Sequence, residues 1–138
     1  MYTLKSIPDH AKSHIIYKHF NLLSSRLETL VYSFMDALVP AYDGGTWDFF
    51  EVVFQNTSET FTVFLMVANI EDKVLVTWPD NYFSEMMSNT AASITACLFA
   101  YSTLAMQTNN IVITDQYHGL LAYAKTLPEF PLIARVID

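Results

Sequence analysis

The stretch AYDGGTWDFF, residues 41–50, marks the place where the periodicity of this sequence changes. The Asp-Gly-Gly triplet tolerates positive φ and favours a turn, whereas the tryptophan and the phenylalanines that follow are typical of a β-strand. Neither G-x-G-x-x-G nor G-x-x-x-x-G-K-[ST] is present, and a helix does not follow the glycines, so a phosphate-binding loop is not indicated. The stretch predicts a joint between a helix and a strand, with Gly44 and Gly45 in the bend. Trp47 and Phe49 share one strand face and are expected to anchor it to the core.

The sequence before this joint has helical character. Apolar residues within 24–40 recur at helical spacing, and Pro40 marks the end of the pattern. Ser25 and Glu28 have the spacing of a capping box at its start. Farther upstream, we expect a short helix after Pro8, because proline suits a first helical turn.

Three runs after the joint are rich in β-branched and aromatic residues: 46–55, 60–68 and 73–78. The polar connectors between them are too short for parallel crossovers, so the sequence predicts a three-stranded antiparallel meander. The run 60–68 is apolar on both faces toward its end and is expected in the centre of the sheet. Residues 81–86 are a candidate for a fourth short strand.

The last third of the sequence predicts helices. One is expected after Ser88, which suits an N-cap, and extends to residue 106 or 107; another begins at Thr114-Asp115 and stops before Pro128. The tail, 131–138, fits a short helix or an extended end. We therefore predict a single α+β domain over 1–138, in which a small antiparallel sheet of three to four strands packs with about four helices.

The longest uncharged segment lies between Glu85 and Asp115. Its apolar part, 94–106, is shorter than the roughly 20 residues that a membrane span requires, so we expect a buried helix and no membrane contact. Cys97 is the only cysteine, which excludes an internal disulfide and favours a reducing compartment. No signal-peptide pattern opens the sequence, and the expected location is the cytoplasm.

The formal net charge is −7, and residues 36–85 carry nine acids against Lys73 alone. A basic stripe is absent, so direct nucleic-acid binding is not expected. The acidic middle either meets a basic partner surface or keeps the protein soluble. The acids that we expect to be exposed, as candidates for partner contact, are Asp43, Asp48, Glu71 and Asp72.

Candidate catalytic and metal-binding groups are sparse. His10 and His14 would share a helix face, with Asp9 or His19 as a further ligand, but H-E-x-x-H and a cysteine pair are both absent. Exposed histidines are therefore the favoured interpretation. Asp48 and Glu51 point to opposite faces of a regular strand and do not form an acid–base pair.

Cys97 could act as a nucleophile only with a partner such as His118. It lies among apolar residues of the predicted helix, where a free cysteine is usually inert. No catalytic residue, metal site or cofactor is expected from the residues themselves.

The run FMDALVPAYDGGTWDFF, 34–50, resembles the signature of the ArdB/KlcA antirestriction proteins. The similarity extends over 81–88, 91–102 and the C-terminus, and covers about residue 17 to the end. It departs most in QNTSET, 55–60, which lacks the glycines expected there. The matching signature residues are Phe34, Met35, Asp36, Tyr42, Gly44, Gly45, Trp47 and Phe49.

The resemblance implies a small cytoplasmic α+β protein of plasmids or prophage-like mobile elements. Such a protein relieves restriction by type I restriction–modification systems without enzymatic activity or a cofactor. Its implied partner is the type I enzyme or a factor that controls it. The alternatives are a small hydrolase or metal-dependent enzyme that uses His10, His14 or Cys97, and a general acidic interaction module.

A DNA mimic must reproduce the charge density of a duplex. B-DNA carries one charge per about 1.7 Å, so the net charge of the acidic middle, about −8, imitates only about 14 Å of duplex. We therefore expect interference with the restriction complex and not extended DNA mimicry.

Overall fold

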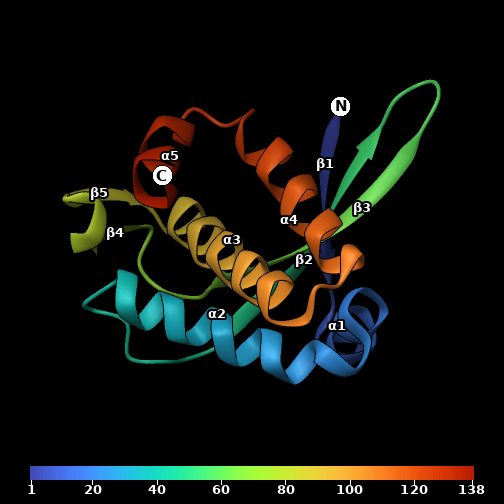
Figure 1. Ribbon diagram of the computed structural model, residues 1–138, viewed down its shortest axis with the longest axis horizontal. Coiled ribbons are helices and arrows are strands. Elements are labelled where there is room, and N and C mark those ends of the chain that lie inside the picture. The colour runs from blue at the N-terminus through green and yellow to red at the C-terminus, as the bar shows by residue number, and fades with distance from the viewer.

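The computed structural model describes all 138 residues and confirms the α+β class. Helix α3 (Asn89–Thr108) crosses the centre of the molecule, with α2 (Ser24–Leu38) along one side and α4 (Ile111–Ala124) along the other (Figure 1). It contacts α2, α4, α5 and the strands β3, β4 and β5. The remaining helices are α1 (Lys12–Phe20) and α5 (Phe130–Ile137).

The central position of α3 explains the uncharged segment of the sequence. Every residue from Ala91 to Leu98 is buried, as expected for a helix that contacts neighbours all round. None of the helices combines the length and the apolar character that a membrane crossing requires.

The strands form two separate antiparallel sheets, which corrects the predicted meander. β2 (Trp47–Gln55) pairs with β3 (Thr60–Ala68), as predicted, but its other neighbour is β1 (Tyr2–Ile7), which the sequence did not predict. The central strand is therefore β2, and β3 lies at an edge. β4 (Lys73–Trp78) does not join this sheet; it pairs with β5 (Phe83–Ser88), close to the predicted fourth strand.

The edge of β3 that faces away from β2 is occupied by helix side chains. These side chains satisfy backbone groups that a further strand would otherwise bond, which explains why β4 is excluded. The Ala68 N–H donates to Ser93 Oγ (3.1 Å), the Phe64 N–H donates to Gln116 Oε1 (2.9 Å), Cys97 Sγ donates to the Met66 carbonyl (3.5 Å), and the Tyr101 hydroxyl donates to the Phe64 carbonyl.

The helix boundaries test the predicted caps. Ser88 caps α3 as predicted, because its Oγ accepts from the Ala91 N–H at 3.0 Å. The capping box at Ser25 is wrong: α2 continues from a 3₁₀ turn, and no side chain caps it. α4 begins at Ile111, earlier than predicted, because Asn110 accepts from the Val112 N–H. The helix expected after Pro8 is confirmed as α1, and the tail is helical.

The β2–β3 hairpin, which extends beyond the helices in Figure 1, needs no glycine at its turn. Asn56 Oδ1 accepts from the backbone N–H groups of Ser58 (2.8 Å) and Glu59 (2.9 Å). An asparagine side chain that bonds the backbone in this way substitutes for a glycine turn. This accounts for the departure of QNTSET from the family pattern.

The bond between Tyr101 and β3 provides a test of the packing. Replacing Tyr101 with phenylalanine removes the hydroxyl that donates to the Phe64 carbonyl, so this buried carbonyl loses that hydrogen bond. We expect Tyr101→Phe to lower the free energy of unfolding by about 1–3 kcal/mol, measured by urea denaturation. Tyr117→Phe is the matched control, since that hydroxyl has no hydrogen-bond partner in the chain, and it should cost less than about 0.5 kcal/mol. Equal losses in both variants would contradict this role.

Candidate functional site

The joint between α2 and β2 has the turn geometry that the sequence predicted. Gly44 and Gly45 have φ angles of 97° and 108°, a region that strongly favours glycine. A Cβ built on either glycine meets no heavy atom within 4 Å. The backbone conformation, and not crowding by neighbours, therefore requires glycine here.

The signature aromatic residues hold this joint against the core. Trp47 and Phe49 are both buried, which confirms that they anchor one face of β2. Trp47 Nε1 donates to the Tyr42 hydroxyl at 3.1 Å, and the Phe49 ring meets Phe64 edge-on with centroids 5.0 Å apart. The Tyr42–Trp47 bond closes the loop, so the conformation of the glycines is fixed from both sides.

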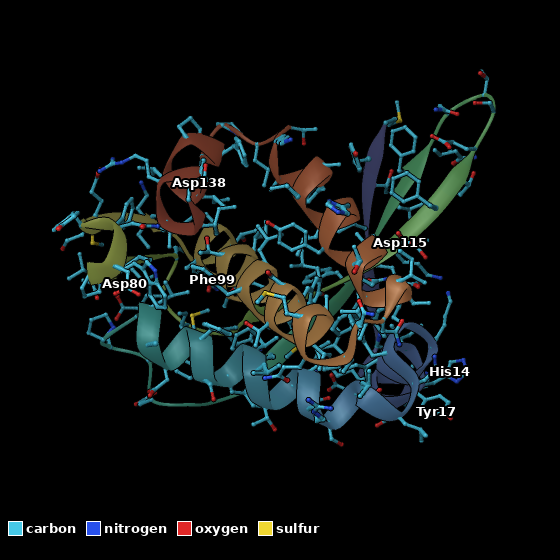
Figure 2. The ribbon with its side chains drawn as sticks, in the orientation of Figure 1. His14, Tyr17, Asp80, Phe99, Asp115 and Asp138 are labelled. Atoms are coloured by element: carbon cyan, nitrogen blue, oxygen red, sulfur yellow. The ribbon has the colours of Figure 1, made fainter.

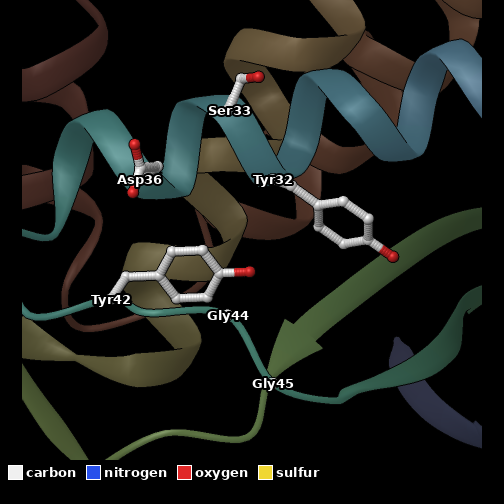
Figure 3. Close-up of a pocket in the computed structure, with 6 residues that line it drawn as sticks. All are labelled: Tyr32, Ser33, Asp36, Tyr42, Gly44 and Gly45. Atoms are coloured by element: carbon white, nitrogen blue, oxygen red, sulfur yellow. The ribbon is translucent and has the colours of Figure 1, made fainter.

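Two grooves flank the joint. The first groove, about 490 Å³, lies between α2 and the loop. Figure 3 shows its lining residues Tyr32 and Asp36 on α2 and Tyr42 on the neighbouring loop. The second, about 530 Å³, lies between the loop, the β3–β4 connector and the β4–β5 sheet. Both grooves are lined by Tyr42, Gly44 and Gly45, so this segment is the wall between them.

The four predicted contact acids are all exposed and lie on the segments around the second groove. Asp43 and Glu71 line it directly, and Asp48 and Asp72 are their near neighbours in the chain. The Asn69 N–H donates to the Thr46 carbonyl at 2.9 Å, so the β3–β4 connector is fastened to the start of β2. This connection brings together acids that are far apart in the sequence.

The histidines proposed as metal ligands do not converge. His10 and His14 are exposed, and Figure 2 shows His14 projecting from α1 into solvent. His19 lies on the buried side of the same helix. The structure contains no group of three or more histidine, cysteine, aspartate or glutamate side chains that could hold a metal ion.

Cys97 has the environment of a structural cysteine. It is fully buried, and burial raises the pKa of its thiol to about 12. The reactive form of cysteine is the thiolate, which this environment disfavours. The structure therefore offers no support for a nucleophilic role with His118.

A buried polar chain that links α1, β2 and α4 was missed by the sequence analysis. Because Gln116 Oε1 accepts from the Phe64 N–H, its amide nitrogen donates to His19 Nδ1 at 3.2 Å. His19 Nε2 then donates to Glu51 Oε2 at 2.7 Å. Lys18 Nζ also donates to Glu51 Oε2, at 2.9 Å.

The ionisation of this chain follows from its partners. Burial lowers the pKa of His19 below its ordinary value of 6.5, although Glu51 opposes the shift. Burial alone would raise the pKa of Glu51, but hydrogen bonds and charge from Lys18 and His19 lower it overall. None of the grooves reaches these residues, so the chain is a structural link between elements.

One signal in the sequence could have found this chain. Glu51 is on the same strand face as Trp47 and Phe49, so strand alternation places a carboxylate in the core. The prediction that Asp48 and Glu51 point to opposite faces is confirmed: Asp48 is exposed and Glu51 is buried. A charged residue on a core face requires a partner, and His19 and Lys18 provide it.

Comparisons with known proteins agree with one another. The family model described as antirestriction protein matches residues 40–138. The uncharacterized protein YafX of Escherichia coli (strain K12) is 30% identical over 142 residues, which cover 99% of this chain and 88% of YafX. An antirestriction protein KlcA of Escherichia coli is 32% identical over 117 residues, 82% of this chain and 75% of that protein.

A solved structure matches the whole fold. It belongs to work on the KlcA and ArdB proteins, described as having a novel fold and antirestriction activity against type I DNA restriction systems in vivo but not in vitro. The TM-score is 0.84 with 27% sequence identity, and the match covers 99% of this chain and 95% of the other.

The buried chain predicts the pH dependence of stability. The lowered pKa of His19 means that the unfolded state binds more protons below pH 6.5, so the free energy of unfolding should decrease as the pH falls through that value. The lowered pKa of Glu51 should add a further loss below pH 4.5. Urea unfolding across this range measures both steps.

Two variants assign the first step. His19→Gln should remove it, whereas His14→Gln, at an exposed position without an ion-pair partner, should retain it. A step that persists in His19→Gln would disprove the assignment to the buried chain.

Proposed function

This chain belongs to the antirestriction protein family, and we propose that it relieves DNA restriction by type I restriction–modification systems. The observation that carries this proposal is the match over nearly the full length to the KlcA and ArdB fold, whose members have this activity in vivo. The signature joint supports it, because the signature residues Gly44 and Gly45 have the positive φ angles of the turn and Trp47 donates to Tyr42 across it. We infer that the protein acts in the cytoplasm of cells that carry its mobile element.

We further propose that the protein acts without catalysis, through contact with the type I enzyme or a factor that controls it. The candidate nucleophile Cys97 is buried in the core, and the exposed His10 and His14 belong to no cluster of three or more metal-binding side chains. An indirect route through a cellular factor is consistent with the activity of KlcA and ArdB in vivo but not in vitro.

The distribution of carboxylates favours a local contact over extended DNA mimicry. A mimic of a duplex requires two long rows of negative charge, whereas here four acids without a salt bridge, Asp43, Asp48, Glu71 and Asp72, lie around a groove beside one loop and the other unpaired acids lie elsewhere on the chain. The same negative charge disfavours direct binding to DNA.

Plating efficiency of unmodified phage on a host with a type I system tests this function. Expression of the protein should raise it toward the value on a non-restricting host, and Cys97→Ser and His10→Gln/His14→Gln should retain the effect. A host with a type II enzyme is the control for general effects on phage growth. Undiminished type I restriction at good expression of folded protein would refute the proposal.

A further inference from the structure

The second groove beside the joint has an apolar side. Leu75 and Met86 are directly opposed across the β4–β5 pair, and 44% and 54% of their surfaces remain exposed. Both line the groove together with Ile70. Exposed apolar side chains that lie together in a groove can pack against an apolar side chain of a partner. The flexible methionine side chain can adjust its conformation to such a contact.

The lining of the same groove also carries negative charge. Asp43 and Glu71 line it, Asp48 and Asp72 lie beside it, and none of the four forms a salt bridge. Lys73 is the only cation in the lining. Three of the other six cations form salt bridges elsewhere: Lys12 with Asp9, Lys18 with Glu51 and Arg135 with Glu85.

The wall of the groove offers free backbone groups. The N–H and C=O groups of residues 43–45 make no hydrogen bond within the chain. Gly44 and Gly45 carry no Cβ, and the space beside them is open. The backbone of a partner can therefore approach this wall closely and bond to it.

We propose that this groove binds an extended segment of a partner protein in which Lys or Arg side chains flank an apolar side chain. The cations meet Asp43 and Glu71, the apolar side chain lies against Leu75 and Met86, and the segment's backbone bonds to residues 43–45. The inference rests on the proposed function only for the identity of the partner, a component or controlling factor of the type I system.

Other occupants fit the groove less well. A second copy of this chain has few cations to offer, because three of its seven form ion pairs and Arg26 donates to Gln107. DNA and other polyanions are repelled by the unpaired carboxylates. A basic segment of a different protein satisfies both the charge and the apolar surface.

Direct binding tests the groove with defined probes. The first is a fluorescein-labelled peptide, Gly-Lys-Arg-Leu-Lys-Ile-Arg-Gly; the second has serine in place of leucine and isoleucine, and the third is a labelled DNA duplex. Fluorescence anisotropy should detect binding of the first peptide alone, and the affinity should fall as salt is raised, because surface charge contacts are screened.

The decisive variant is Asp43→Asn/Glu71→Gln, which preserves side-chain shape. It should weaken binding of the first peptide about tenfold at low salt. The matched control is Glu59→Gln/Asp115→Asn, which removes the same charge from exposed acids of the β2–β3 turn and α4, and it should change affinity by less than about twofold. Sedimentation of the wild type checks for self-association.

Several results would overturn the inference. These are absence of peptide binding, equal binding of the serine peptide, preference for the duplex, equal losses in the two variants, and a dimer that the groove variant abolishes. Leu75→Ser provides a second variant: it should weaken binding of the first peptide because it removes an apolar contact while the carboxylates of the groove remain in place.

The phage assay separates this inference from the proposed function. If the wild type relieves restriction and Asp43→Asn/Glu71→Gln does so equally well, the groove is not the acting surface, although the function stands. If the wild type does not relieve restriction but its peptide binding depends on the groove, the docking site stands and the function falls. Loss of relief in the groove variant alone supports both.

Discussion

The arrangement of this protein depends on how the backbone hydrogen-bonding groups at the outer edge of β3 find partners. Strand edges normally bond another strand, but here the Phe64, Met66 and Ala68 backbone groups bond side chains of α3 and α4. The central helix is thereby fixed against the sheet, and β4 is forced to pair with β5 elsewhere. The β3–β4 connector must consequently turn back beside the α2–β2 joint, where Asn69 bonds Thr46. The groove beside the joint is a direct result of that turn.

Local patterns in the sequence were sufficient for most of the elements and not for their pairing. The α2 and α3 helices, the Ser88 cap, the glycine turn and the β2–β3 hairpin were predictable, because each is determined by residues close in the sequence. The place of β4 was not, since it depends on Tyr101 and Gln116, far from β3 in the chain. β1 was missed because it is only six residues long, its residues from Thr3 to Ser6 stay exposed, and its partner β2 lies far away in the chain.

The candidate site was predictable in its residues but not in its shape. The acids Asp43 and Glu71 were recognisable as exposed turn residues, and the signature pointed to Gly44 and Gly45. The sequence did not indicate that Leu75 and Met86 are exposed. Val74, Leu75 and Val76 are all apolar, so the sequence of β4 does not show which of its two faces is buried. Only the pairing of β4 with β5, beside the loop, places the exposed Leu75 and Met86 in the same groove as the carboxylates.

The two carboxylate environments of the chain illustrate how charge is divided between stability and recognition. Glu51 is buried and bonded by His19 and Lys18, so its charge is compensated inside the fold and unavailable to a partner. Asp43 and Glu71 are exposed and form no salt bridge within the chain, so a partner cation can approach them without displacing an internal partner. Exposed charges contribute modestly to affinity but strongly to the rate and selectivity of encounter. A groove that joins such charges to an apolar surface therefore selects a protein segment by both properties, which a charge-only imitation of DNA does not do.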